Sequence, residues 1–137
     1  MKPTLTTRLV ATFKAIAMLF IVGFLGTQFS EAATYYVAQN GSWSNTCAQA
    51  QSLQTPLASI AVGVQCLSPG DTLIVRQGVY SEMIGEFMYI PTGTRDYPIT
   101  IMSYPGEKVT MEAPYWAEHG NLLELYNLQF ITFKGFA

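Results

Sequence analysis

The sequence predicts an all-β fold, and the spacing of its strand-like segments indicates a solenoid. After Gly70 the chain consists of short segments in which apolar and polar residues alternate, as in strands with one buried side. Apolar runs begin at Leu73, Ile99 and Leu122, and a recurrence of roughly 20 to 30 residues is typical of stacked coils. No Asn-Gly hairpin signal separates adjacent runs, but so few recurrences leave a two-layer sandwich open as the alternative.

Residues 1–32 have the organisation of a secretory signal peptide. A basic segment is followed by an apolar run over residues 15–26 and by small residues up to Ala32. A membrane anchor is the alternative, but a spanning helix needs ~20 apolar residues and this run is shorter. We predict cleavage after about Ala32, no stable membrane span afterwards, and one domain over residues 33–137. The predicted location is secreted, periplasmic or at the cell surface.

The charge of the predicted mature chain argues against nucleic acid as a partner. Residues 1–32 remove three of the seven basic and one of the nine acidic residues, leaving four and eight, a formal charge of −4. Nucleic acid phosphates are bound by faces rich in Lys and Arg, which this chain lacks.

Two cysteines, Cys47 and Cys66, are predicted to form a disulfide, because an exported chain meets an oxidising compartment. Free thiols are the alternative. With His119 as the one histidine they make a poor metal set, so we predict no metal or cofactor site in this segment.

The segment between the first strand and Gly70 contains one predicted helix. The first strand is predicted over residues 34–38 and a loop over 40–45. Thr55 is the predicted cap and Pro56 the first helical residue, and Pro69 and Gly70 end the helix. The apolar stripe at helical spacing comprises Leu57, Ile60, Ala61, Val64 and Leu67, with Cys66 on the opposite side.

The remaining strands are predicted from alternation and from the turn signals between them. Turns are indicated at residues 91–98, 104–107 and 118–121. The predicted strands cover residues 72–76, 78–82, 86–90, 98–104, 108–113, 122–126 and 129–136.

Several motifs in this order resemble the start of secreted right-handed parallel β-helix proteins. They are ATYYVAQNGS, TPLASIAVGVQCLSPGDTLIVRQGVYSE, IPTGTRDYPITIMSYPGEKVTME and NLQFITFKGF, and together they cover nearly all of residues 33–137. The resemblance is to the pectate-lyase-like superfamily, including alginate-lyase and chondroitinase-type polysaccharide lyases. It implies a right-handed parallel β-helix with an N-terminal capping helix and about three coils, ending within an early coil.

The resemblance implies an acidic polysaccharide as the partner and β-elimination as the full-length reaction. Lyases of this kind need a base and a positive charge or a cation, and the resemblance implies Ca²⁺ in some full-length relatives. These groups sit on later coils, so no catalytic residue is assigned here and the segment itself is predicted to be structural. The alternatives are a non-catalytic surface or adhesive β-helix module and an inactive truncated gene product.

A few residues stand out as local candidates, each with a simpler structural alternative. Glu82 and Glu86 are a candidate cation pair or two solvated acids. Arg76 is a candidate for a substrate carboxylate or the partner of an acid, and His119 is an acid–base candidate or an exposed loop residue. Tyr115 and Trp116 are the preferred candidates for stacking on sugar rings, with Trp43 as a third, and packing is the alternative for all three.

Overall fold

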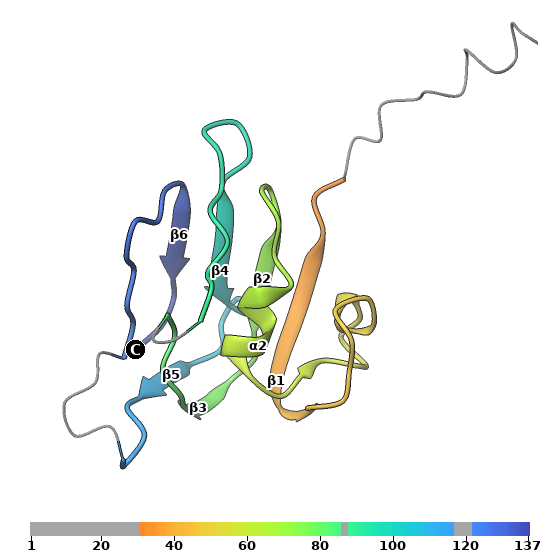
Figure 1. Cartoon of the computed structure of the whole chain (residues 1–137). Helices are drawn as coiled ribbons and strands as arrows, with labels where there is room; N and C mark the ends of the chain where they lie inside the picture. The colour runs from red at the N-terminus through yellow and green to blue at the C-terminus, as the bar shows by residue number, and fades with distance from the viewer. Residues whose placement is uncertain (1–30, 86–87, 117–121) are drawn as a thin grey trace, which may run out of the picture. The chain divides into compact units, whose positions relative to one another are not determined.

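Six strands and two short helical segments make up the described part of residues Ala32–Ala137 (Figure 1). The structure is a computed structural model that describes residues 31–85, 88–116 and 122–137. The strands are β1 (Thr34–Ser42), β2 (Thr72–Val75), β3 (Gly78–Ser81), β4 (Ile99–Ser103), β5 (Val109–Glu112) and β6 (Ile131–Lys134). A 3₁₀ turn, η1 (Gln49–Gln51), and a short helix, α2 (Ile60–Gln65), lie between β1 and β2.

All the ladders that join the six strands are parallel. One sheet has the order β1-β2-β4-β6 and the other pairs β3 with β5. Parallel neighbours cannot be joined by a tight hairpin, so the chain must leave the sheet and return between them. The hairpin sandwich that the sequence left open is therefore wrong for the described strands, and the all-β prediction with parallel strands is confirmed.

The core lies on one face of the four-stranded sheet, where the ladders place apolar residues in register. Tyr35 pairs with Leu73, Leu73 with Ile101 and Ile101 with Phe133, so these four side chains form one row. Leu73 and Ile101 are fully buried. At about 25 cal/mol per Å² of apolar surface removed from water, such rows supply the main stabilisation of the fold.

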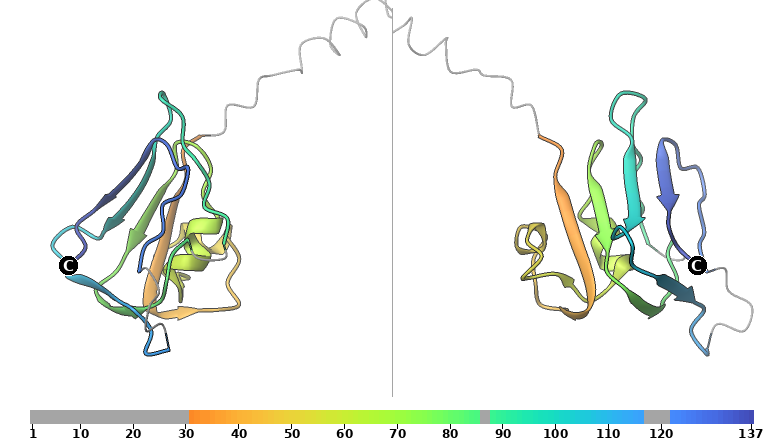
Figure 2. Two further views of the ribbon diagram at one scale, coloured as in Figure 1. Left: turned by 60° about the vertical axis from the view of Figure 1, so that its left-hand side comes forward. Right: turned by 180° about the vertical axis from the view of Figure 1, so that it is seen from behind.

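Helix α2 packs against this buried face, and Figures 1 and 2 show it on one side of the sheet, close to β1 and β2. A Cβ atom at Gly63 would lie 2.8 Å from Val37 Cγ2 and 2.9 Å from Leu73 Cδ1. Glycine is therefore needed for close helix–sheet contact, although it has a poor helix propensity. Ile60 and Val64, from the predicted stripe, are fully buried.

The predicted start of this helix is wrong. Ser59, and not Thr55, is the N-cap, and its side chain accepts a hydrogen bond from Val62 N. Leu57 is buried but not helical, because it forms parallel bridges with β1, and the carbonyl of Pro56 accepts a hydrogen bond from Ser42 N. The backbone groups of Pro56 and Leu57 are thus paired with β1, so they are not available for the hydrogen bonds of a helix that begins at Pro56.

Two predicted strands are also not formed as strands in the described residues. Residues 88–90 and 122–126 carry no ladder apart from an isolated parallel bridge between Ile84 and Leu123. Alternation alone does not make a strand without a neighbour that takes its backbone hydrogen bonds. Conversely, β1 extends to Ser42, into the segment predicted as loop.

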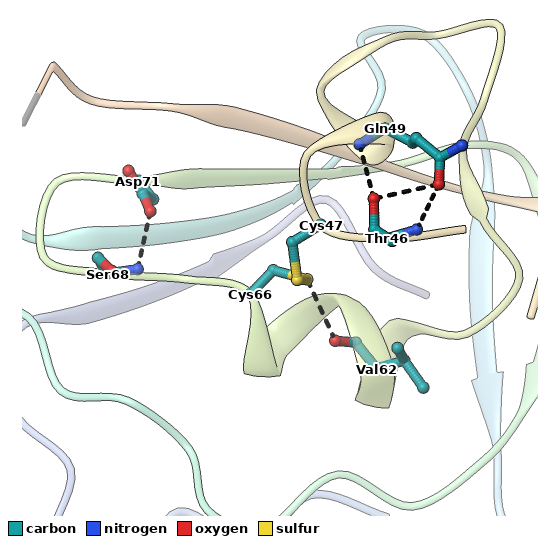
Figure 3. Close-up of a disulfide and its surroundings, with 7 residues drawn as sticks. All are labelled: Thr46, Cys47, Gln49, Val62, Cys66, Ser68 and Asp71. Carbon is teal, nitrogen blue, oxygen red and sulfur yellow. Dashed lines mark hydrogen bonds between the residues drawn. A yellow bond between two sulfur atoms is a disulfide. The ribbon is translucent and has the colours of Figure 1, made fainter. Parts of the chain in front are cut away.

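The disulfide Cys47–Cys66 fastens the segment before α2 to the end of that helix (Figure 3). The Cα atoms are 5.5 Å apart, and the bond closes a separation of 19 residues. The turn after the helix is held by buried Asp71, whose carboxylate accepts hydrogen bonds from Ser68 N and Ala33 N, both at 2.8 Å. Within the described ranges no helix is both long and apolar enough to cross a membrane.

Candidate functional site

The three aromatic residues singled out in the sequence are all exposed. The side chains of Trp43, Tyr115 and Trp116 are 74%, 95% and 66% exposed, so none of the three is a buried core residue. Contact with sugar rings by Tyr115 and Trp116 remains a prediction. No pocket described below includes these two residues.

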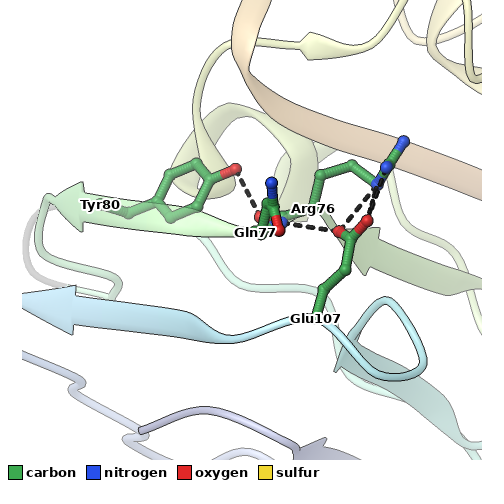
Figure 4. A network of polar contacts seen from close by, with 4 residues as sticks. All are labelled: Arg76, Gln77, Tyr80 and Glu107. Carbon is green, nitrogen blue, oxygen red and sulfur yellow. Dashed lines mark hydrogen bonds and ion pairs between the residues drawn. The ribbon is translucent and has the colours of Figure 1, made fainter.

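Arg76 is paired with an acid, as its structural alternative predicted (Figure 4). Its Nε and Nη2 atoms donate to the carboxylate of Glu107 at 2.6–2.9 Å, and its guanidinium carbon lies 4.7 Å from the centre of the Tyr104 ring. These hydrogen bonds raise the pKa of Arg76 and hold the pKa of Glu107 below its usual range. The pair joins the corner after β2 to the corner after β4.

The buried side chain of Tyr80 is hydrogen-bonded to the backbone at Arg76. Its hydroxyl donates to the carbonyl oxygen of Arg76 at 2.9 Å, and burial raises the pKa of Tyr80 to about 12. Tyr80 is therefore a neutral structural donor at physiological pH.

Glu82 is not a solvated acid, because it is hydrogen-bonded at the start of α2. Its carboxylate accepts hydrogen bonds from Ser59 Oγ at 2.6 Å and from Ile60 N and Ala61 N at 2.9 Å, which places it at the start of α2. Its predicted partner Glu86, and His119, lie outside the described residues. Where the chain is described, His, Cys, Asp and Glu form no group of three that could hold a metal ion.

A first pocket lies elsewhere, between the chain that follows β3 and the chain that precedes β6. We call it the tyrosine pocket. It has a volume of about 350 Å³, within the range of small-ligand sites. Its lining consists of the apolar residues Met88, Ile90 and Leu128 together with Gly85, Tyr89, Thr92, Glu124, Tyr126 and Asn127.

Two strongly exposed tyrosines, Tyr89 and Tyr126, line this one pocket. Their side chains are 78% and 80% exposed, although residues of this size usually bury much of their surface. They come from segments 37 residues apart in sequence, which the bridge between Ile84 and Leu123 holds side by side. Exposed aromatic faces at a pocket are typical of ligand contact.

The wall of the tyrosine pocket depends on close backbone contact at Gly85. Glu124 N donates to the carbonyl of Ile84 at 2.8 Å, and a Cβ on Gly85 would lie 2.0 Å from the carbonyl oxygen of Glu124. Gly85 also has a φ of +101°, which side chains disfavour. The pocket wall is thus built from two backbones in direct contact.

The chemistry of the pocket suits a ring with apolar faces and a hydroxylated edge. The tyrosine rings offer flat apolar surfaces, Glu124 and Asn127 offer acceptor oxygens, and Asn127 and Thr92 offer donors. Glu124 is the one charged side chain among the lining residues, so a ligand hydroxyl is a better partner there than a carboxylate.

Sequence reasoning missed Tyr89 and Tyr126 because both fall in segments predicted as strands. In such a segment an aromatic residue is an ordinary strand former. The sequence did contain a signal for exposed tyrosines. The two predicted strands end in MYI and LELY, and in each the tyrosine is next to a residue of the apolar pattern, so it falls on the opposite face.

The comparisons with known proteins concern the fold. No protein-family model and no curated protein matches the chain. A structure described as the complex of XylC with xylose matches 56% of this chain and 11% of that one, at 33% identity and a TM-score of 0.48. A rhamnogalacturonan lyase structure matches 77% of this chain and 28% of that one, at 16% identity and a TM-score of 0.51.

The described chain is therefore an all-β structure with parallel strands that shares its fold with part of a rhamnogalacturonan lyase. The lyase is named for its polymer. This chain spans 28% of the length of the lyase and 11% of the length of XylC.

Proposed function

We propose that residues 33–137 form a capping helix and about three windings of a right-handed parallel β-helix. Three sets of parallel pairs support it: Thr72 with Thr100, Gly78 with Val109, and Ile84 with Leu123. Each pair joins residues 28 to 39 positions apart, as expected when the chain passes three faces in turn and then begins the next winding. The fold shared with a rhamnogalacturonan lyase is consistent with this architecture.

The proposed protein is exported, with residues 1–32 removed as a signal peptide. The charge and hydropathy pattern of this segment supports export, and so does the disulfide between Cys47 and Cys66. Mass spectrometry of the protein recovered outside the cytoplasm is expected to find a new N-terminus near Ala33. A recovered protein that still carries residues 1–32 would contradict the proposal.

The proposed function is to bind a polysaccharide chain in the tyrosine pocket. The observation that carries this proposal is the pair of exposed rings, Tyr89 and Tyr126, in the lining of one pocket. A sugar ring has apolar C–H faces and a hydroxyl edge, so it can contact both rings and exchange hydrogen bonds with Glu124 and Asn127. Because Glu124 disfavours another negative charge, the unit seated here is one that presents hydroxyl groups.

The sequence resemblance implies that the polymer is acidic and that the whole protein cleaves it by β-elimination. The pocket supports binding, and its residues include no cation that could stabilise an enolate. We therefore propose polysaccharide binding as the function of these residues. β-Elimination is the activity that the resemblance implies for the whole protein.

The binding proposal is tested with the purified protein and a panel of pectate, alginate, chondroitin and neutral xylan. Affinity electrophoresis or calorimetry is expected to detect binding to at least one polymer. Replacing both pocket tyrosines (Y89A/Y126A) is expected to weaken that binding at least tenfold, as for an aromatic hot spot. The matched control is Tyr97→Ala, which removes an exposed tyrosine outside the pocket.

The result that overturns the binding proposal is unchanged affinity in the folded Y89A/Y126A variant, or no binding to any polymer in the panel. Elimination is followed separately, because its unsaturated product absorbs in the ultraviolet.

A further inference from the structure

Trp43 is an exposed aromatic residue on a loop that is held rigidly from both sides. On one side Ser42 N donates to the carbonyl of Pro56 at 3.0 Å, and on the other Asn45 Nδ2 donates to the same oxygen at 2.8 Å. Two residues after Asn45, Cys47 is bonded to the end of α2. The loop backbone is therefore ordered before any ligand arrives, which reduces the entropy lost on binding.

The Trp43 side chain lines a second pocket, of about 420 Å³, which we call the Trp43 pocket. Gln39, Val79, Ser81 and Glu82 are among its other lining residues. Val79 is 48% exposed, so an apolar patch lies beside the exposed indole. The Glu82 carboxylate is hydrogen-bonded to the start of α2, and Gln39 Nε2 donates to the carbonyl of Val79. Ser81 and the amide oxygen of Gln39 are therefore the polar groups for a ligand hydroxyl.

A third pocket, the Arg76 pocket, adjoins the Trp43 pocket because Gln39 lines both. It has a volume of about 330 Å³, and its lining includes Asn40, Arg76 and Gln77. The Glu107 carboxylate, which is not among the lining residues, is paired with Arg76 and accepts a hydrogen bond from Gln77 N at 2.7 Å. Arg76 uses Nε and Nη2 for Glu107, and its Nη1 donates to none of the described residues. Its Nη1 hydrogens and the side-chain amides of exposed Asn40 and Gln77 are donors that suit a carboxylate.

We propose that the Trp43 and Arg76 pockets together bind two neighbouring units of a glycan that carries carboxylate groups. One ring stacks on Trp43, and the carboxylate of the next unit accepts hydrogen bonds from Arg76 Nη1, Asn40 and Gln77. The site lies on residues other than those of the tyrosine pocket, so it stands or falls independently of the proposed function.

The test uses a background in which the tyrosine pocket is removed (Y89A/Y126A) and Trp116 is replaced by Phe. The chain has two tryptophans, so fluorescence in this background reports Trp43 alone. The probes are an oligogalacturonate and a xylo-oligosaccharide of equal length. A saturable change in Trp43 fluorescence with the oligogalacturonate is expected, with at least fivefold weaker binding of the neutral probe.

Two variants test whether oligogalacturonate binds at the Trp43 and Arg76 pockets. Trp43→Ala, followed by calorimetry, is expected to weaken oligogalacturonate binding at least tenfold. Asn40→Asp keeps the shape but adds a negative charge, and is expected to weaken oligogalacturonate binding about threefold to tenfold without affecting the neutral probe. Gln129→Glu makes the same charge change at an exposed position outside both pockets and is expected to have no effect. Circular dichroism confirms that each variant is folded.

The proposal is overturned if oligogalacturonate leaves Trp43 fluorescence unchanged, if both probes bind equally, or if N40D and Q129E behave alike. If polymer binding by the wild-type protein is lost in Y89A/Y126A while Trp43 gives no response, the tyrosine pocket stands and this second site fails. The reverse pattern supports the second site and rejects the tyrosine pocket.

Discussion

The carboxylate of Glu82 accepts a hydrogen bond of 2.6 Å from the hydroxyl of Ser59, the residue that caps helix α2. Glu82 directly follows β3, so one side chain ties the helix to the end of a strand in the smaller sheet. The same carboxylate accepts two backbone N–H groups from the first turn of the helix, where negative charge is favoured.

Replacing Glu82 by Gln is expected to destabilise the fold by about 1 to 2 kcal/mol, because an uncharged amide replaces an acceptor of three hydrogen bonds. Urea unfolding followed by circular dichroism measures the change. Glu112→Gln is the control, since Glu112 is exposed on β5. Equal unfolding free energies for the two variants would mean that the Glu82 cap contributes nothing.

Removing the disulfide in a C47A/C66A double variant is expected to lower the free energy of unfolding by ~3 kcal/mol in the chain-entropy model. The bond closes a loop of 19 residues between the β1 side of the fold and α2. Chemical unfolding with and without a reductant measures the effect. The reductant should destabilise the wild-type protein alone, and a wild-type protein indifferent to it would contradict the prediction.

The Arg76–Glu107 pair predicts a specific loss of stability in acid. Hydrogen bonds from Arg76 lower the pKa of Glu107 in the folded state, so this contribution is present above the unfolded pKa of about 4.3 and is lost as the pH falls through the folded value. Glu107→Gln should therefore be less stable than wild type at neutral pH, with the difference shrinking as the pH falls below the unfolded pKa of Glu107.

Urea unfolding of wild type and Glu107→Gln over this pH series checks the prediction. A stability difference that stays constant from neutral pH to acid would show that the Glu107 charge is not coupled to folding.

Gly85 and Gly106 form a matched pair of positive-φ glycines, with φ of +101° and +81°. A Cβ at Gly106 meets nothing within 4 Å, whereas one at Gly85 would lie 2.0 Å from the carbonyl oxygen of Glu124. Gly106→Ala is expected to cost about 1–2 kcal/mol from backbone strain alone, and Gly85→Ala clearly more.

Thermal unfolding of the two glycine variants measures the difference, and polymer binding should weaken in Gly85→Ala because the wall of the tyrosine pocket must move. Equal melting temperatures would contradict the close contact described for Gly85.

Much of the strand pattern could be predicted locally. The segments around β2, β4 and β5 were found within a few residues, because each alternates apolar and polar residues and is bounded by Pro or Gly. The start of α2 could not be found in this way. Thr55, Pro56 and Ser59 all suit a helix start, and the pairing of Leu57 with β1 and the contact of Ser59 with Glu82 selected Ser59.

The candidate sites were less accessible from the sequence than the strands. Trp43 and Arg76 were each noticed, but Gln39, which lines a pocket with each of them, carries no signal of its own. Tyr89 and Tyr126 were hidden by their place in strand-like segments.

The amino-acid order by itself indicated the extended segments around β2, β4 and β5 and the pairing of the two cysteines, because these depend on residue type and on neighbours along the chain. The tertiary structure alone decided that Tyr89 meets Tyr126 at one pocket and that Arg76 meets Glu107. Such contacts join residues 31 and 37 positions apart, and they depend on the register in which parallel strands stack, which the lengths and shapes of the intervening turns set.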